Sequence, residues 1–187
     1  MLKIQNEIDL PPLGPGWAGA VMGLGISSTL IDVHVTPLLG SAPSKAMLGV
    51  VTILAISLVF GFLKHHNPGF YAADMPAWGM VSMGILSLGS AYSLIYDAWS
   101  VHTLCWAIGT VLGAVTCIRF LMFLICDRPS APAFTWGLPL VAPMVAATSS
   151  AQLAPHAGEW GSIVHSIGVI SFALAWLTAV PTFAFVY

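Results

Sequence analysis

Long apolar stretches interrupted by single charged residues make up almost the whole chain. The charges delimit six uncharged intervals, Asp9 to Asp32, Lys45 to Lys64, Asp74 to Asp97, Asp97 to Arg119, Arg128 to Glu159 and Glu159 to the C-terminus. Each interval can hold a membrane-spanning helix, which needs about 20 residues at a rise of about 1.5 Å per residue. Helices are expected because hydrocarbon does not tolerate unpaired backbone groups. The pattern predicts helical spans at residues 15–36, 45–64, 76–96, 101–126, 134–154 and 160–187.

The composition points to a protein whose main solvent is the lipid bilayer. Of the 187 residues, 58% are hydrophobic and 6% are charged, whereas a soluble domain carries about 25% charged residues. The net charge is −2 and there is no basic run, which argues against nucleic-acid binding. The three cysteines, Cys105, Cys117 and Cys126, show no C-x-x-C spacing, so we interpret them as small hydrophobic residues rather than a disulfide or zinc site.

The basic residues are distributed unequally between the two ends of the predicted spans. Lys3, Lys64, Arg119 and Arg128 fall on or near one side, and Lys45 falls on the other. Basic residues accumulate on the cytoplasmic side of membrane proteins. This distribution predicts a multi-pass protein of the cell membrane with a cytoplasmic N-terminus.

A motif at the start of the first span returns twice along the chain. Pro15-Gly-Trp17 with Met22-Gly23 recurs 61 residues later as Pro76-Ala-Trp78 with Met83-Gly84, and Trp136-Gly137 follows Trp78-Gly79 by 58 residues. This spacing predicts one transmembrane domain, 1–187, of three tandem helical hairpins, 15–64, 76–126 and 134–187. Repeats of the same orientation are related by an axis along the membrane normal. Because the apolar run reaches Tyr187 without a polar tail, we expect the domain to be incomplete at its C-terminus.

Small and hydroxyl-bearing residues are concentrated in the first, third and fifth spans, which we call the odd-numbered spans. The second span, by contrast, reads AMLGVVTILAISLVFGFL and is mainly bulky and aliphatic. One interpretation is close helix packing, as in the G-x-x-x-G pair Gly19 and Gly23. We favour the other, an inward-facing pathway, because the bias follows the repeat, and we expect the odd-numbered spans to be less exposed to lipid. The candidate pore-lining residues are Gly23, Ser27, Gly84, Ser87, Pro143 and Ser150.

These motifs resemble those of a known family. Residues 13–26, Phe70-Tyr71 followed by Met75-Pro-Ala-Trp-Gly79, and residues 136–145 are similar to the entries of the odd-numbered helices in the tellurite-resistance/dicarboxylate transporter (TDT) family, which includes the plant slow anion channels. The resemblance implies an all-α fold of five hairpins and ten helices around a central pore lined by odd-numbered helices, of which this chain supplies six helices. It also implies a homo-oligomer, typically a trimer, that passes C4-dicarboxylates, sulfite, chloride, nitrate or tellurite-related anions, without a cofactor. The chain departs from the family pattern at Ala18 and Leu24, where an aromatic residue and a threonine are common.

Arg119 is the one charge well inside a predicted span. Its side chain can extend to the lipid headgroups, as long cationic side chains near helix ends do. Alternatively, it can attract anions to the inner mouth of a pathway. Both interpretations stay open at this point.

The histidines raise the question of a haem. His34, His102 and His165 fall near predicted span ends, and His65-His66 follows Lys64 in an inner loop. Axial haem ligands need similar depth on facing helices, which these positions do not favour. No catalytic or metal-binding motif is recognised, so the sequence predicts neither an enzyme nor a metal site. The alternative function is a structural or haem-bearing membrane subunit of a larger complex.

Overall fold

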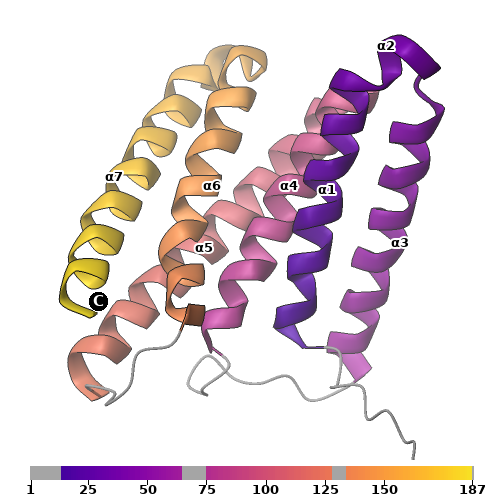
Figure 1. The fold of residues 1–187 in the computed structure, drawn as a ribbon. Helices are drawn as coiled ribbons and strands as arrows, with labels where there is room; N and C mark the ends of the chain where they lie inside the picture. Colours follow the sequence, from indigo (N-terminus) through magenta and orange to yellow (C-terminus); the bar gives the residue numbers. More distant parts are fainter. Residues whose placement is uncertain (1–13, 65–74, 128–133, 187) are drawn as a thin grey trace, which may run out of the picture.

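The described part of the structure is helical throughout. A computed structural model describes residues 14–64, 75–127 and 134–186 (Figure 1). The α-helices are α1 (Ala18–His34), α2 (Thr36–Leu39), α3 (Ala42–Lys64), α4 (Trp78–Tyr96), α5 (Trp99–Asp127), α6 (Gly137–Leu153) and α7 (Gly161–Val186). The predicted all-α class is confirmed. Outside the described residues lie Lys3, His65, His66, Phe70, Tyr71 and Arg128.

The three repeated motifs begin with the same local structure. Short 3-10 turns at Pro15–Trp17, Met75–Ala77 and Phe134–Trp136 lead directly into α1, α4 and α6. Proline is well placed in the first two turns, because the first turn of a helix needs no backbone N–H donor. Each turn therefore starts a helix at an equivalent place in the repeated motif.

Five helical segments are long and apolar enough to cross a membrane. They are Pro15–His34, Ala42–Lys64, Met75–Tyr96, Trp99–Cys126 and Gly158–Ala184, so the chain is a multi-pass membrane protein surrounded by lipid. They account for five of the six predicted spans; the sixth, at 134–154, corresponds to α6, which has 17 residues, contains Pro143 and stays a predicted span. Helix α6 packs against α4, α5 and α7, and a helix covered by protein needs less apolar surface than one facing lipid.

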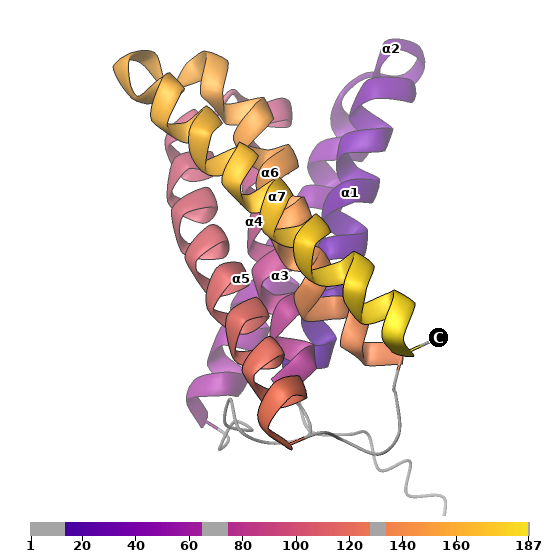
Figure 2. The same cartoon turned by 90° about the vertical axis from the view of Figure 1, so that its left-hand side faces the viewer.

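The helices form an inner row and an outer row. Helix α4 packs against α1 and α6, while α3, α5 and α7 pack behind their hairpin partners α1, α4 and α6. Figure 1 shows the sequence of helices from α7 across α6 and α4 to α1 and α3, and Figure 2 shows α7 crossing in front of α6. The odd-numbered spans thus lie next to one another.

Burial follows this arrangement for α4 and α6 but not for α1. Half of an 18-residue stretch of the α4 segment is buried, compared with 22% of an equal stretch of α3. Helix α6 buries eight residues from Pro139 to Leu153. An equal stretch of the α1 segment is also only 22% buried, so within this chain the first span is as exposed as α3, contrary to the expected difference. The reason is that α1 packs through one face, against α3 and α4, and leaves the opposite face open.

Small residues stand where helices approach most closely. A Cβ on Gly79 of α4 would lie 2.7 Å from the Leu138 carbonyl oxygen at the start of α6. A Cβ on Gly113 of α5 would lie 2.7 Å from Ser82 Oγ, and the Ser82 hydroxyl donates to the Gly109 carbonyl at 2.7 Å. Close backbone approach of this kind is how membrane helices associate. Helix packing therefore accounts for part of the small-residue bias.

The first predicted span ends earlier than expected, in a polar turn. Helix α1 stops at His34, the short α2 follows, and Gly40 has a positive φ of 80° before α3. The Asp32 carboxylate accepts hydrogen bonds from the hydroxyls of Thr36 at 3.1 Å and Ser44 at 2.8 Å. Asp32 thus connects α1 to both α2 and α3.

Candidate functional site

The open face of α1 and of the turn before it carries a stripe of small side chains that ends at a histidine, which we call the α1 stripe. It consists of Gly16, Ala20, Gly23, Ser27 and His34, which are exposed or, for Ser27, half-buried. Their spacings of three, four and seven residues place them on one helix face. The packed residues of α1, Ala18, Val21, Gly25 and Ser28, occupy the other face.

The α1 stripe differs from the exposed face of α3. There the side chains are bulky and apolar, as Ile53, Phe60 and Leu63 show with exposed fractions of 68%, 67% and 80%. Such a face is suited to lipid tails. From Gly16 to Ser27 the α1 stripe offers little apolar area to lipid, whereas the exposed Leu30 lies on the same face between Ser27 and His34, and the exposed Ile26 lies beside it.

Gly23 and Ser27 are brought together at the middle of this stripe. The Ser27 hydroxyl donates to the Gly23 carbonyl at 2.9 Å. This hydrogen bond to its own helix fixes the position of the Ser27 oxygen. A Cβ on Gly23 would meet no atom within 4 Å. These two of the predicted pore-lining residues therefore face open space.

Gly84 and Ser87 lie at the contact between α4 and α1. A Cβ on Gly84 would lie 3.0 Å from the Ala18 carbonyl oxygen, and a Cβ on Gly25 would lie 3.1 Å from Ser87 Oγ. The Ser87 hydroxyl donates to the Gly84 carbonyl at 3.0 Å. At these positions the structure shows tight helix packing.

Pro143 and Ser150 are buried in α6. The Trp106 indole N–H of α5 donates to Ser150 Oγ at 2.7 Å, and the Ser150 hydroxyl donates to the Ala146 carbonyl at 2.8 Å. Ser150 therefore joins α6 to α5. The six predicted residues occupy three separate places: the α1 stripe, the α1–α4 contact and the interior around α6.

Arg119 lies on an exposed part of α5, eight residues before the helix ends at Asp127. This is the end of the bundle at which α3 also ends and α4 and α6 begin (Figure 1). The position is compatible with both interpretations of its charge.

His102 lies near the start of α5, as the sequence indicates, but its burial was not predicted. It is fully buried on α5, whereas His34 and His165 are exposed. Its Nδ1 lies 2.9 Å from Ser93 Oγ and its Nε2 lies 2.8 Å from Ser149 Oγ. Both ring nitrogens are thus occupied by serine hydroxyls, and within the described ranges no group of three His, Cys, Asp or Glu residues could hold a metal.

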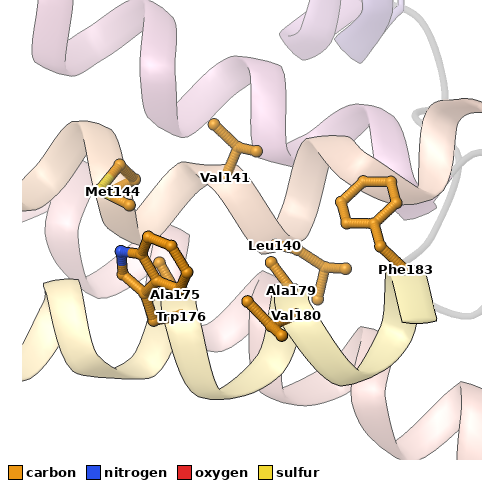
Figure 3. A pocket seen from close by; sticks show the side chains of 8 residues that line it. All are labelled: Leu140, Val141, Met144, Ala175, Trp176, Ala179, Val180 and Phe183. Atoms are coloured by element: carbon orange, nitrogen blue, oxygen red, sulfur yellow. The ribbon is translucent and has the colours of Figure 1, made fainter. Parts of the chain in front are cut away.

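An apolar groove runs between α6 and α7 (Figure 3). One part, of about 370 Å³, is lined by Leu140, Val141 and Met144 of α6 and by Ala175, Trp176, Ala179, Val180 and Phe183 of α7. A second part, of about 310 Å³, continues along the same two helices past Thr148 and His165. Its apolar lining offers little to an anion.

A comparison with known protein families identifies the family of this chain. No curated protein and no solved structure matches the chain significantly. The family model described as SLAC1, voltage-dependent anion channel, matches residues 12–187, a range that includes every described helix. This is a family of transport proteins and not of enzymes, and it agrees with the resemblance in the odd-numbered spans. The chain belongs to the SLAC1 family of voltage-dependent anion channels.

Proposed function

We propose that this protein passes small anions across the plasma membrane through a pore lined by its odd-numbered spans, which correspond to helices α1, α4 and α6. The observation that carries the proposal is the family match over residues 12–187. The α1 stripe, which carries no fixed charge between Gly16 and Ser27, supports it, because a pathway without fixed buried cations favours weak binding and fast exchange of the anion. The candidate substrates are C4-dicarboxylates, sulfite, chloride, nitrate and tellurite-related anions.

Within this pore, Gly23 and Ser27 are the proposed lining residues with the strongest support, since both lie on the α1 stripe. Gly84, Ser87, Pro143 and Ser150 stay candidates, and their contacts with neighbouring helices favour a role in setting the width of the pore. Arg119 is the proposed cation that concentrates anions at the inner mouth, a long-range effect of a charge near an entrance.

The groove between α6 and α7 supports the proposal of further hairpins. Helix α4 packs against the first hairpin and α6 packs against both helices of the second, whereas the third hairpin exposes its apolar groove. One more inner helix in that groove would continue the row toward the five-hairpin, ten-helix ring. By the same resemblance we propose a homo-oligomer, a trimer.

Anion uptake tests the proposed function. Liposomes containing the full-length protein should accumulate at least one of these anions faster than protein-free liposomes. A visible absorption spectrum of the same sample is the second readout. A Soret band without any anion uptake would instead support the haem-bearing subunit.

The proposed orientation predicts which loops face the outside. In a cysteine-free background, Asp97→Cys, at the exposed α4–α5 junction, should react with an impermeant thiol reagent added to intact cells. Lys64→Cys, at the last residue of α3, should react only after the membrane is permeabilised. The reason is the accumulation of basic residues on the cytoplasmic side. Labelling of the cysteine at position 64 from outside would show that the orientation is the reverse of the proposed one.

A further inference from the structure

Three helices are joined by one buried polar network around His102, which we call the His102 network. It contains Ser90 and Ser93 from α4, His102 from α5, and Ser149 and Gln152 from α6. His102 and Ser93 are fully buried and Ser149 is 3% exposed. The network thus connects two helices of the inner row, α4 and α6, through a side chain of the outer row.

The donors and acceptors around His102 determine the direction of each hydrogen bond. In the described part of the chain, His102 Nε2 is the acceptor within reach of the Ser149 hydroxyl, at 2.8 Å, and the Ser90 hydroxyl oxygen lies farther from it, at 3.5 Å. Ser149 therefore donates to Nε2, and the neutral ring carries its proton on Nδ1. Nδ1–H donates to Ser93 Oγ at 2.9 Å, and the Ser93 hydroxyl donates to the Ser90 carbonyl at 2.9 Å.

Gln152 completes the arrangement. Its side-chain amide donates to Ser93 Oγ at 3.1 Å and approaches the Ser90 carbonyl at 3.4 Å. The opposite tautomer of His102 would donate from Nε2 to Ser149 and leave the buried Ser149 hydroxyl proton without an acceptor. Leaving a buried donor unsatisfied is costly, so the Nδ1–H tautomer fits this network and the other does not.

We propose that His102, as the neutral Nδ1–H tautomer, is a positioning residue that fixes the separation of α4 and α6 and so sets the anion selectivity of the pathway. The consequence for selectivity rests on the proposed function. His102 itself touches no anion and acts through the serines of the two inner helices.

Aromatic stacking closes one side of the network. The Trp99 ring stacks on the His102 ring with centroids 5.9 Å apart. It also stacks on the exposed His156 ring, with centroids 3.5 Å apart and an interplanar angle of 7°. His156 is the titratable group that faces this end from beyond α6. Trp99 therefore separates the buried imidazole from the exposed one.

The tautomer is measurable without any transport assay. In full-length protein labelled with ¹⁵N-histidine and held in lipid, the His102 signal, assigned by its loss in His102→Asn, should show a protonated Nδ1 and an unprotonated Nε2 at neutral pH. A ring protonated on Nε2, alone or together with Nδ1, would overturn the proposal. This result does not depend on whether the protein moves anions.

The positioning role is tested by the ratio of C4-dicarboxylate to chloride flux in liposomes. His102→Asn keeps a donor near the Nδ1 position but places no acceptor at the Nε2 position, and it should change this ratio by up to about fivefold, the factor reached if the free energy of one net hydrogen bond enters the discrimination in full. The control is Ser57→Ala, at an exposed position on α3 where the hydroxyl bonds only its own helix, and it should leave the ratio unchanged.

Assembly is checked by size-exclusion chromatography in both variants. If His102→Asn does not assemble, Ser149→Ala serves in its place, because it removes one hydroxyl and keeps the ring. An unchanged ratio in a correctly assembled His102→Asn or Ser149→Ala protein would overturn the proposal. Absence of any flux in the unmodified protein would refute the proposed function instead, and the tautomer measurement would still stand.

Discussion

Leucine in place of Gly23 is expected to abolish anion flux while the protein still folds and assembles. Gly23 faces open space, and a Cβ at this position would have no other atom within 4 Å, so the new side chain meets no packed neighbour. If the α1 stripe lines the pathway, four added carbon atoms narrow it and replace a polar backbone surface with an apolar one. The measurement is anion uptake into liposomes, with oligomer size checked by chromatography.

Two matched variants separate blocking from misfolding. Gly49→Leu places the same bulk on an exposed position of α3, again with no atom within 4 Å, and should leave flux intact because that face meets lipid. Gly84→Leu should instead reduce assembly, since its Cβ would lie 3.0 Å from the Ala18 carbonyl. Normal flux through a well-assembled Gly23→Leu protein would remove this position from the pore.

Alanine in place of Gly79 is expected to destabilise the fold by itself. The added Cβ would lie 2.7 Å from the Leu138 carbonyl oxygen and 2.9 Å from the Pro139 nitrogen. Both contacts are with backbone atoms, which cannot rotate away. Overpacking of this kind costs about 1–3 kcal/mol, so the thermal transition of the purified protein should move to a lower temperature.

The control for this variant is Gly49→Ala on α3. Alanine is preferred over glycine in a helix by about 1 kcal/mol, and position 49 has room for it, so the transition should stay or rise. A Gly79→Ala protein as stable as the unmodified one would contradict the close contact between α4 and the start of α6.

The helices themselves could be predicted because hydropathy and length determine them. The apolar run 45–64 became α3 almost unchanged, and the repeated motifs start α1, α4 and α6. No local signal in the sequence shows that neighbouring helices cover α6. Its burial depends on contacts with α4, α5 and α7.

The faces of the helices were harder to predict than the helices. Gly23 and Gly84 occupy equivalent places in the repeat, yet one is open and the other touches α1. A repeat in the sequence produces equivalent positions along a helix, but the neighbours differ between a helix at the end of the inner row and one in its middle. The interpretation of both as pore-lining did not include this difference.

His102 shows the same limit for polar residues. Its place near the start of a predicted span was correct, but the sequence did not indicate that its side chain is fully buried. Its partner Ser93 is nine residues away and Ser149 is 47 residues away. The sequence signal that was available is the set of serines near the same end of the third and fifth spans, which can receive a buried imidazole.

Conduction of anions by this protein is tested most directly by a reversal potential. The full-length protein is incorporated into a planar bilayer that separates two concentrations of potassium chloride. We expect a current whose reversal potential lies close to the equilibrium potential of chloride and that Gly23→Leu abolishes. A reversal potential close to that of potassium, or no current from a correctly assembled protein with any of the candidate anions, would contradict anion conduction.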